Sequence, residues 1–164
     1  MKNKAFQDYY PDDVAHCYGC GNLNEHGHRI KSRWDGDEAV CTFRPEPYHT
    51  SFPGYAYGGL VASLVDCHSM GTAAAAWMRA NGMEIGEVPT ARFVTGSLKV
   101  DYLKPTPIDC ELEIRARATE VGERKVIVDS EVIADGVVTA RGHTIAVRMP
   151  DHLVPKEDNH PTPA

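Results

Sequence analysis

Residues 57–78 read YGGLVASLVDCHSMGTAAAAWM, an apolar run that contains one acidic residue. Alanine and leucine favour a helix, no proline interrupts the run, and Gly82 follows it as a stop signal. Because the run is apolar on nearly every side, we expect the helix to be buried. A carboxylate in a buried helix is costly without a partner, so Asp66 is a candidate catalytic residue. At the helix start, the backbone N–H groups of Gly58 and Gly59 can stabilise a developing negative charge.

The composition of the chain predicts one soluble domain. Its 164 residues, 42% of them hydrophobic, are enough for a single hydrophobic core. The net charge of −6 argues against a nucleic acid or a membrane surface as a partner. Asp66 and His68 inside the apolar run favour a buried helix over a membrane span. Five cysteines without a secretory signal pattern predict a reducing, cytoplasmic location.

Alternating polar and apolar residues predict strands on both sides of the helix. The expected strands are 30–34 and 39–43 before the helix, and 94–102, 111–118, 125–134 and 137–148 after it. Asp135-Gly136 predicts a tight turn between the last two strands. One helix among consecutive strands predicts an α+β fold, in which a curled antiparallel sheet wraps the apolar helix. We expect residues 17–148 to form this domain, 1–16 an N-terminal arm, and 149–164 a flexible C-terminal tail.

Three segments of the chain carry recognisable motifs, which are CYGCG at 17–21 with Asn24 and Gly27, GYAYGG at 54–59 with LVD at 64–66, and TGSLKVDYLKP at 95–105. Together they resemble the PaaI-like acyl-CoA thioesterase family, whose members have the hotdog fold. The resemblance covers about residues 16–148, with His28 at a position where the family usually has Leu. It implies a hotdog fold, an acyl-CoA substrate, hydrolysis of the thioester to free acid and CoA, and no cofactor.

The resemblance also implies roles for individual residues. By position, the oxyanion glycine is Gly58 and the catalytic acid is Asp66. The hydroxyl residue at the start of the next strand is Thr95. Ser51 stands where relatives often have Asn or Gln, and Tyr57 stands where they usually have His. All five are therefore candidate catalytic residues.

The spacing of the two main candidates predicts a homodimer. Eight helical residues rise about 12 Å, so the Gly58 N–H and the Asp66 carboxylate of one chain cannot both reach one thioester carbon. Two antiparallel helices packed across a two-fold axis can place Gly58 of one subunit beside Asp66 of the other. A homodimer, or a homotetramer built as a dimer of dimers, is therefore expected. Asp66 would act as general base or as nucleophile, and the sequence leaves both open.

Coenzyme A carries phosphates, which need cations at the rim of the pocket. Lys104, Arg124 and Lys125 are candidates by position, although solvated strand ends explain them as well. Gly59 is a further candidate for substrate binding, at the helix start.

Cys17 and Cys20, with histidines nearby at 16, 26 and 28, resemble half of a zinc site. One Cys-x-x-Cys lacks the second pair that makes such a pattern specific. The sequence therefore predicts two small buried thiols near a turn, and no metal.

Two other functions remain open at this point. A hotdog dehydratase or hydratase acting on a 3-hydroxyacyl thioester would need a histidine and an acid together, and His49 is a candidate. In the dehydratases that this pattern resembles, the histidine directly precedes Phe-Pro, whereas His49 does not. A non-catalytic acyl-CoA sensor would suit Tyr57 but would not need Asp66.

Overall fold

The apolar run forms a single long helix, α1 (Gly58–Ala80), in a computed structural model that describes residues 4–87 and 89–154. Gly82 follows the helix with φ 74°, a left-handed conformation that favours glycine. The N–H of Gly82 donates to the Arg79 carbonyl and closes the last turn. Both the helix and its stop signal are confirmed.

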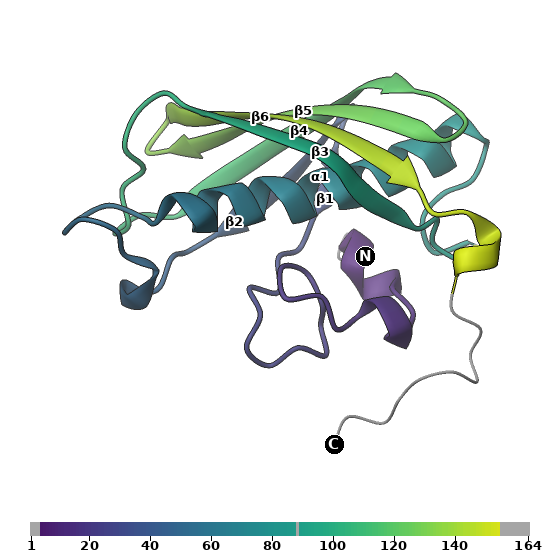
Figure 1. Ribbon diagram of the computed structural model, residues 1–164, viewed down its shortest axis with the longest axis horizontal. Helices are drawn as coiled ribbons and strands as arrows, with labels where there is room; N and C mark the ends of the chain where they lie inside the picture. The colour runs from purple at the N-terminus through teal and green to yellow at the C-terminus, as the bar shows by residue number, and fades with distance from the viewer. Residues whose placement is uncertain (1–3, 88, 155–164) are drawn as a thin grey trace.

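Six antiparallel strands form one sheet in the order β1-β2-β4-β5-β6-β3. The strands are β1 (Arg33–Asp35), β2 (Glu38–Phe43), β3 (Phe93–Tyr102), β4 (Leu112–Val121), β5 (Lys125–Ala134) and β6 (Val137–Arg148). The sheet curls over one side of α1 (Figure 1). Asp135 and Gly136 turn between β5 and β6 with positive φ at both residues. This architecture confirms the predicted α+β hotdog fold.

The hydrophobic core lies between α1 and the inner face of the sheet. Leu64 and Val65 of the helix pack in one cluster with Leu112, Ile114 and Val132 of the strands, and all five are buried. Burial of each such side chain is worth about 1.5–3 kcal/mol, so this contact holds the helix in place.

The first strand begins later than the predicted range of 30–34. The carbonyl of Ser32 accepts from the N–H of Phe6 at 2.8 Å, and the N–H of Ile30 donates to Gly19 at 3.3 Å. The backbone of this segment therefore pairs with the N-terminal residues, and β1 starts at Arg33.

The N-terminal segment packs against α1 on the side away from the sheet (Figure 1). It contains two short 3-10 helices, η1 (Phe6–Tyr9) and η2 (Asp12–Val14). Phe6 is buried, and the side chain of Gln7 forms two hydrogen bonds with Ser32. Gly71 of α1 is close to this segment: a Cβ there would lie 3.3 Å from both Gln7 and Tyr10. The sheet thus covers one side of the helix, and the N-terminal segment covers part of another side.

Two more 3-10 helices complete the described chain. η3 (Pro47–His49) precedes α1, and η4 (Asp151–Leu153) follows β6. Of the predicted C-terminal tail, residues 155–164 lie outside the described residues. Within the described ranges, no helix has the length and hydropathy of a membrane span.

Candidate active site

The start of α1 presents two backbone donors. Tyr57, directly before the helix, is extended, and no side chain caps the first turn. In the described part of the chain, the N–H groups of Gly58 and Gly59 donate to no acceptor. The Tyr102 hydroxyl donates to the Gly58 carbonyl at 2.7 Å, which holds the first turn against β3. Free N–H groups and the positive end of the helix dipole can together stabilise an oxyanion.

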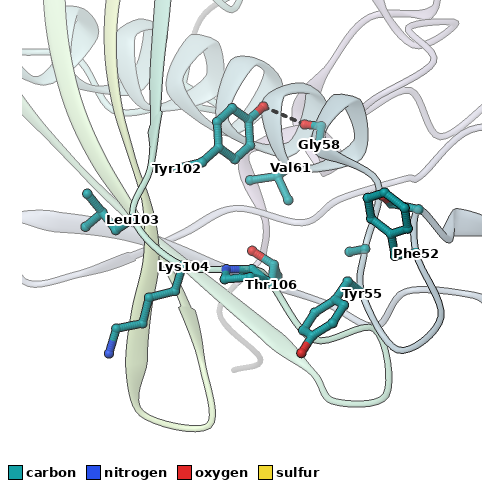
Figure 2. Close-up of a pocket in the computed structure, with 11 residues that line it drawn as sticks. Phe52, Tyr55, Gly58, Val61, Tyr102, Leu103, Lys104 and Thr106 are labelled. Atoms are coloured by element: carbon teal, nitrogen blue, oxygen red, sulfur yellow. Dashed lines mark hydrogen bonds between the residues drawn. The ribbon is translucent and has the colours of Figure 1, made fainter.

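A pocket of about 510 Å³ lies beside this helix start (Figure 2). Its lining residues are Ser51, Phe52, Tyr55, Ala56, Gly58, Val61, Tyr102, Leu103, Lys104, Pro105 and Thr106. Three predicted site residues, Ser51, Gly58 and Lys104, are therefore together. The side chain of Lys104 extends away from Gly58 in Figure 2. The volume is large enough for a small ligand.

Tyr57 lies beside this pocket rather than in its lining. Its ring lies against Gly59, where a Cβ would overlap the ring. The Tyr57 N–H donates to the His49 carbonyl at 2.8 Å. The absence of a side chain at Gly59 therefore lets the exposed Tyr57 ring lie against the first turn of α1.

Tyr102 is a residue to which the sequence analysis assigns no function. It is the last residue of β3, and burial, followed by the nearby Tyr57, raises its pKa above the ordinary value. Its position at the end of the alternating run 94–102 predicts only that a strand ends there. Its hydrogen bond to Gly58 depends on how the strand packs against the helix, which no local pattern shows.

Asp66 lies two turns further along α1 and has a hydrogen-bond partner. The Thr95 hydroxyl of β3 donates to Asp66 Oδ1 at 2.6 Å. The expectation of a buried carboxylate is wrong, because the side of α1 that Asp66 shares with Ala62 and Met70 is only half-buried. Asp66 and Thr95 line a second pocket of about 510 Å³. Thr95 thus orients one carboxylate oxygen.

Four of the five predicted catalytic residues therefore fall into two separate pockets. Ser51 and Gly58 line the first, and Asp66 and Thr95 line the second. Their separation agrees with a helical rise of about 12 Å between positions 58 and 66. The described chain alone does not combine the oxyanion donor with the acid.

Arg124 and Lys125 lie far from Gly58 within the same chain. They follow the turn after β4, where the Trp77 indole N–H donates to the carbonyl of Glu123 at 3.1 Å. Trp77 is near the end of α1, whereas Gly58 is its first residue. Lys104 therefore lies near the start of α1, whereas Arg124 and Lys125 lie near its end.

His28 and His49 pack together near the start of α1. Their ring centroids are 5.4 Å apart, and His28 Nε2 lies 3.3 Å from the Ser63 hydroxyl. Burial lowers the pKa of both histidines below the ordinary value. His49 Nδ1 accepts from the N–H of Glu46 at 2.8 Å, which occupies one ring nitrogen.

His68 is part of the core rather than of the site. Its Nε2 donates to the Ala39 carbonyl at 3.0 Å, and its Nδ1 lies 2.8 Å from the Ser32 hydroxyl. Burial lowers its pKa to about 4, although the bond to Ala39 opposes this shift. The imidazole is therefore neutral near pH 7 and does not pair with Asp66.

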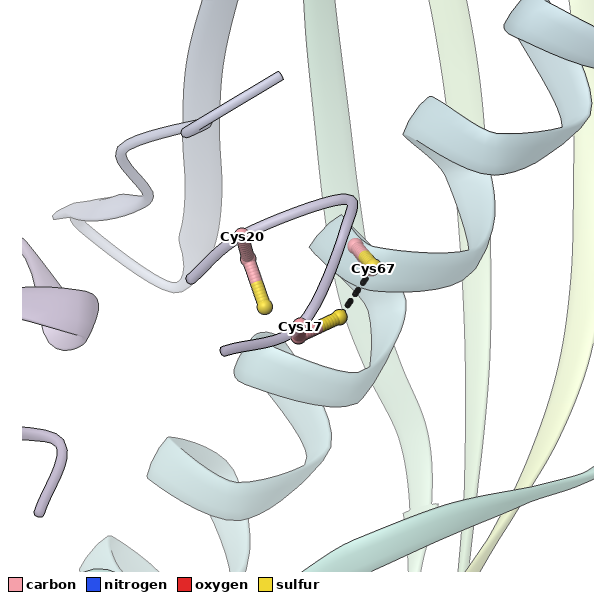
Figure 3. A group of neighbouring side chains, drawn as sticks. All are labelled: Cys17, Cys20 and Cys67. Carbon is pink, nitrogen blue, oxygen red and sulfur yellow. Dashed lines mark hydrogen bonds between the residues drawn. The ribbon is translucent and has the colours of Figure 1, made fainter. Parts of the chain in front are cut away.

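The fold brings a third cysteine to the pair predicted from sequence (Figure 3). Cys17 and Cys20 lie in a loop that faces Cys67 on α1, and Cys17 Sγ is 3.6 Å from Cys67 Sγ. Cys20 is buried as predicted, whereas the prediction that Cys17 is buried is wrong, because its loop position leaves it exposed. Hydrogen bonds from the Cys20 and Cys67 thiols lower the pKa of Cys17 below its ordinary value.

This fold and site define a hotdog protein with groups suited to acyl-group chemistry. The chain belongs to the thioesterase superfamily, whose family model matches residues 53–141. It is 41% identical to a thioesterase superfamily protein from Shewanella loihica PV-4, with a TM-score of 0.65. That match covers 86% of this chain and 100% of the Shewanella chain.

Two further relatives are more distant. The chain is 30% identical over 93 residues to acyl-coenzyme A thioesterase THEM4 of Xenopus laevis, covering 57% of this chain. It spans only 36% of the length of that relative. The E. coli PaaI protein, from the phenylacetic acid degradation operon, is 17% identical with a TM-score of 0.61. The match covers 75% of this chain and 81% of PaaI, and it shows a common fold.

Proposed function

We propose that this protein is an acyl-CoA thioesterase that acts as a homodimer, with each active site built from both subunits. The observation that carries the proposal is the separation of Gly58 from Asp66 in two pockets of one helix. The THEM4 relative, an acyl-coenzyme A thioesterase, supports the substrate class.

The surface of the chain supports a dimer. β3 is at the edge of the sheet, paired with β6 on one side only, and a ten-residue open edge invites another strand. Val94 and Leu98 of this strand are 45% and 37% exposed. The half-buried side of α1 with Asp66 adjoins it through the Thr95 hydrogen bond. A second copy on this surface would cover the apolar residues and bring its own Gly58 toward Asp66.

The proposed reaction uses only groups of the chain and water. The thioester oxygen accepts a hydrogen bond from the Gly58 N–H, while Asp66 of the partner takes a proton from water. Thr95 occupies Asp66 Oδ1, so Oδ2 remains free to accept from that water. The water oxygen bonds to the carbonyl carbon, the C–S bond breaks, and the CoA sulfur leaves as the thiolate. The thiolate takes the proton that Asp66 accepted from the water, which restores the Asp66 carboxylate. The products are a carboxylic acid and CoA.

A panel of acyl-CoA esters tests the activity through release of free thiol. Turnover of at least one ester is expected. Binding of CoA without thiol release would instead support a sensor. Formation of an enoyl thioester from a 3-hydroxyacyl-CoA, with the C–S bond intact, would support a dehydratase.

Single turnover in heavy-oxygen water tests the role of Asp66. A general base leads to label in the released acid and none in Asp66. Label in the Asp66 carboxylate after one turnover would show an anhydride intermediate, and so a nucleophile.

Mixed dimers test the shared site. One chain carries Asp66→Ala and the other Gly58→Pro, so each homodimer has one defect in both sites. The heterodimer collects both defects in one site and leaves the other intact, so it should recover up to about half of the wild-type activity. The control is a homodimer in which every chain carries both substitutions, and it should recover no activity. Verified heterodimers without activity would contradict the shared site.

A further inference from the structure

Three cysteine sulfurs gather beside Asp66 but have no part in the proposed hydrolysis. The sulfurs of Cys17, Cys20 and Cys67 all lie within 4.8 Å of one another. Two come from the loop after η2, and the third comes from α1, where it directly follows Asp66 (Figure 3). Fifty residues separate Cys17 from Cys67, so the cluster is a product of the tertiary fold.

The CYGCG turn is shaped to present its two thiols. The N–H of Gly21 donates to the Cys17 carbonyl at 2.7 Å and closes the turn. A Cβ on Gly19 would overlap Cys67 Sγ, and one on Gly21 would overlap the backbone of Cys17. The turn is thereby held close against Cys67 of α1.

The spacing of the sulfurs fits a tetrahedral metal site. With Zn–S bonds of about 2.3 Å, sulfurs at two corners of a tetrahedron are about 3.8 Å apart. Cys17 and Cys67 are separated by 3.6 Å, and no pair exceeds 4.8 Å, so small side-chain rotations suffice. A disulfide needs about 2.05 Å and would leave the third thiol unused.

We propose that Cys17, Cys20 and Cys67 bind one Zn²⁺ ion as three thiolates. All three cysteines line the second pocket, so the fourth coordination position faces that pocket and takes a water molecule. The ion ties the N-terminal loop to α1 next to Asp66. It takes no part in the hydrolysis, because Gly58 and Asp66 already supply the donor and the base.

Metal content of the reduced full-length protein tests the site. We expect about one zinc per chain after purification from zinc-supplemented cells, measured by mass spectrometry of the elements. The stripped protein should bind Co²⁺ at one equivalent, with the ultraviolet charge-transfer absorption of thiolate–cobalt bonds. Cys67→Ser and, independently, Cys17→Ser should weaken zinc binding at least ~100-fold, because loss of even an outer partner costs about 10–100-fold. Cys110→Ser, at a cysteine outside the cluster, is the matched control and should bind like the wild type.

Three results would overturn the proposal. The first is a reduced, folded wild-type protein that neither retains nor binds zinc. The second is zinc that Cys17→Ser and Cys67→Ser both retain, because the ion would then lie elsewhere. The third is a Cys17–Cys67 disulfide that forms in air in place of metal binding, which would make the cluster a redox pair. Circular dichroism identifies a variant that fails to fold. Cys17→Ser is the variant least expected to disturb folding, because Cys17 is exposed. None of these readouts uses thioester turnover, so they stand apart from the proposed function.

Discussion

Replacing Gly58 with proline removes the proposed oxyanion donor while leaving the helix intact. Gly58 is the first residue of α1, a position at which proline is favoured because its missing N–H has no helical partner. Tyr57, the residue before it, has φ −63° and ψ 133°, the extended conformation that a residue before proline prefers. A Cβ at position 58 would lie 3.6 Å from the Tyr102 ring, which is ordinary contact. Gly58→Pro should therefore fold.

The expected loss in kcat is about 10²–10³-fold, or about 2.7–4 kcal/mol, the effect of removing one oxyanion donor. Gly58→Ala is the matched control, because it adds the Cβ but keeps the N–H, and its kcat should stay within about threefold of the wild type. Both variants should melt at or above the wild-type temperature, since each restricts the unfolded chain more than glycine does.

Thiol release from the best acyl-CoA ester measures both variants, with kcat and KM determined separately. A fall in kcat at constant KM indicates a donor that acts in the transition state. A rise in KM alone would mean that the proline ring only obstructs substrate. If folded Gly58→Pro turned over as fast as Gly58→Ala, the Gly58 N–H would not be the oxyanion donor.

Three more predictions follow from the same structure. Asp66→Asn should fold, because an amide can still accept from Thr95 Oγ1, but should lose at least ~100-fold in kcat, the contribution of a general base; a wild-type rate would refute the assignment. His68 has a pKa of about 4 in the fold and about 6.5 when unfolded, so the unfolded chain binds the proton more strongly and stability falls as the pH drops from about 6.5 to 4. This loss of unfolding free energy reaches about 3 kcal/mol at pH 4. In urea unfolding, the free energy of His68→Asn should therefore depend less on pH than that of His16→Asn, a control at an exposed histidine. Equal pH dependence of the two variants would contradict this role of His68. Removal of zinc should lower the melting temperature but leave the kcat of the folded protein within about threefold of its value with zinc. Thermal denaturation and thiol release, each measured before and after chelation, test this. A loss of turnover in the folded apoprotein would mean that the ion takes part in the reaction.

The main features of the fold could be predicted because they depend on neighbouring residues. Helix propensity, the absence of proline and the glycine after the last turn define α1. Period-two alternation and Asp135-Gly136 define the last strands and their turn. The first strand was predicted less well, since Ile30 and Ser32 alternate like strand residues but bond to the N-terminal segment instead.

The site was predictable only as far as single residues carry a signal. The glycines at a helix start and the acid in an apolar run identify Gly58 and Asp66 as candidates without any structure. The hydrogen bond from Thr95 to Asp66 spans 29 residues, and the resemblance, rather than any local pattern, pointed to Thr95. Tyr102, 44 residues from Gly58, had no such signal.

The sequence by itself determined the elements of this protein, because hydrophobic period, capping and turn chemistry are local properties. Only the tertiary structure decided that one side of α1 stays half-buried, with Asp66 in a different pocket from Gly58. It also decided that Cys67 joins the Cys17–Cys20 turn. Both outcomes depend on how the sheet and the N-terminal segment divide the surface of the helix between them. That division is a matter of packing between segments far apart in the chain, which the order of residues within one segment does not express.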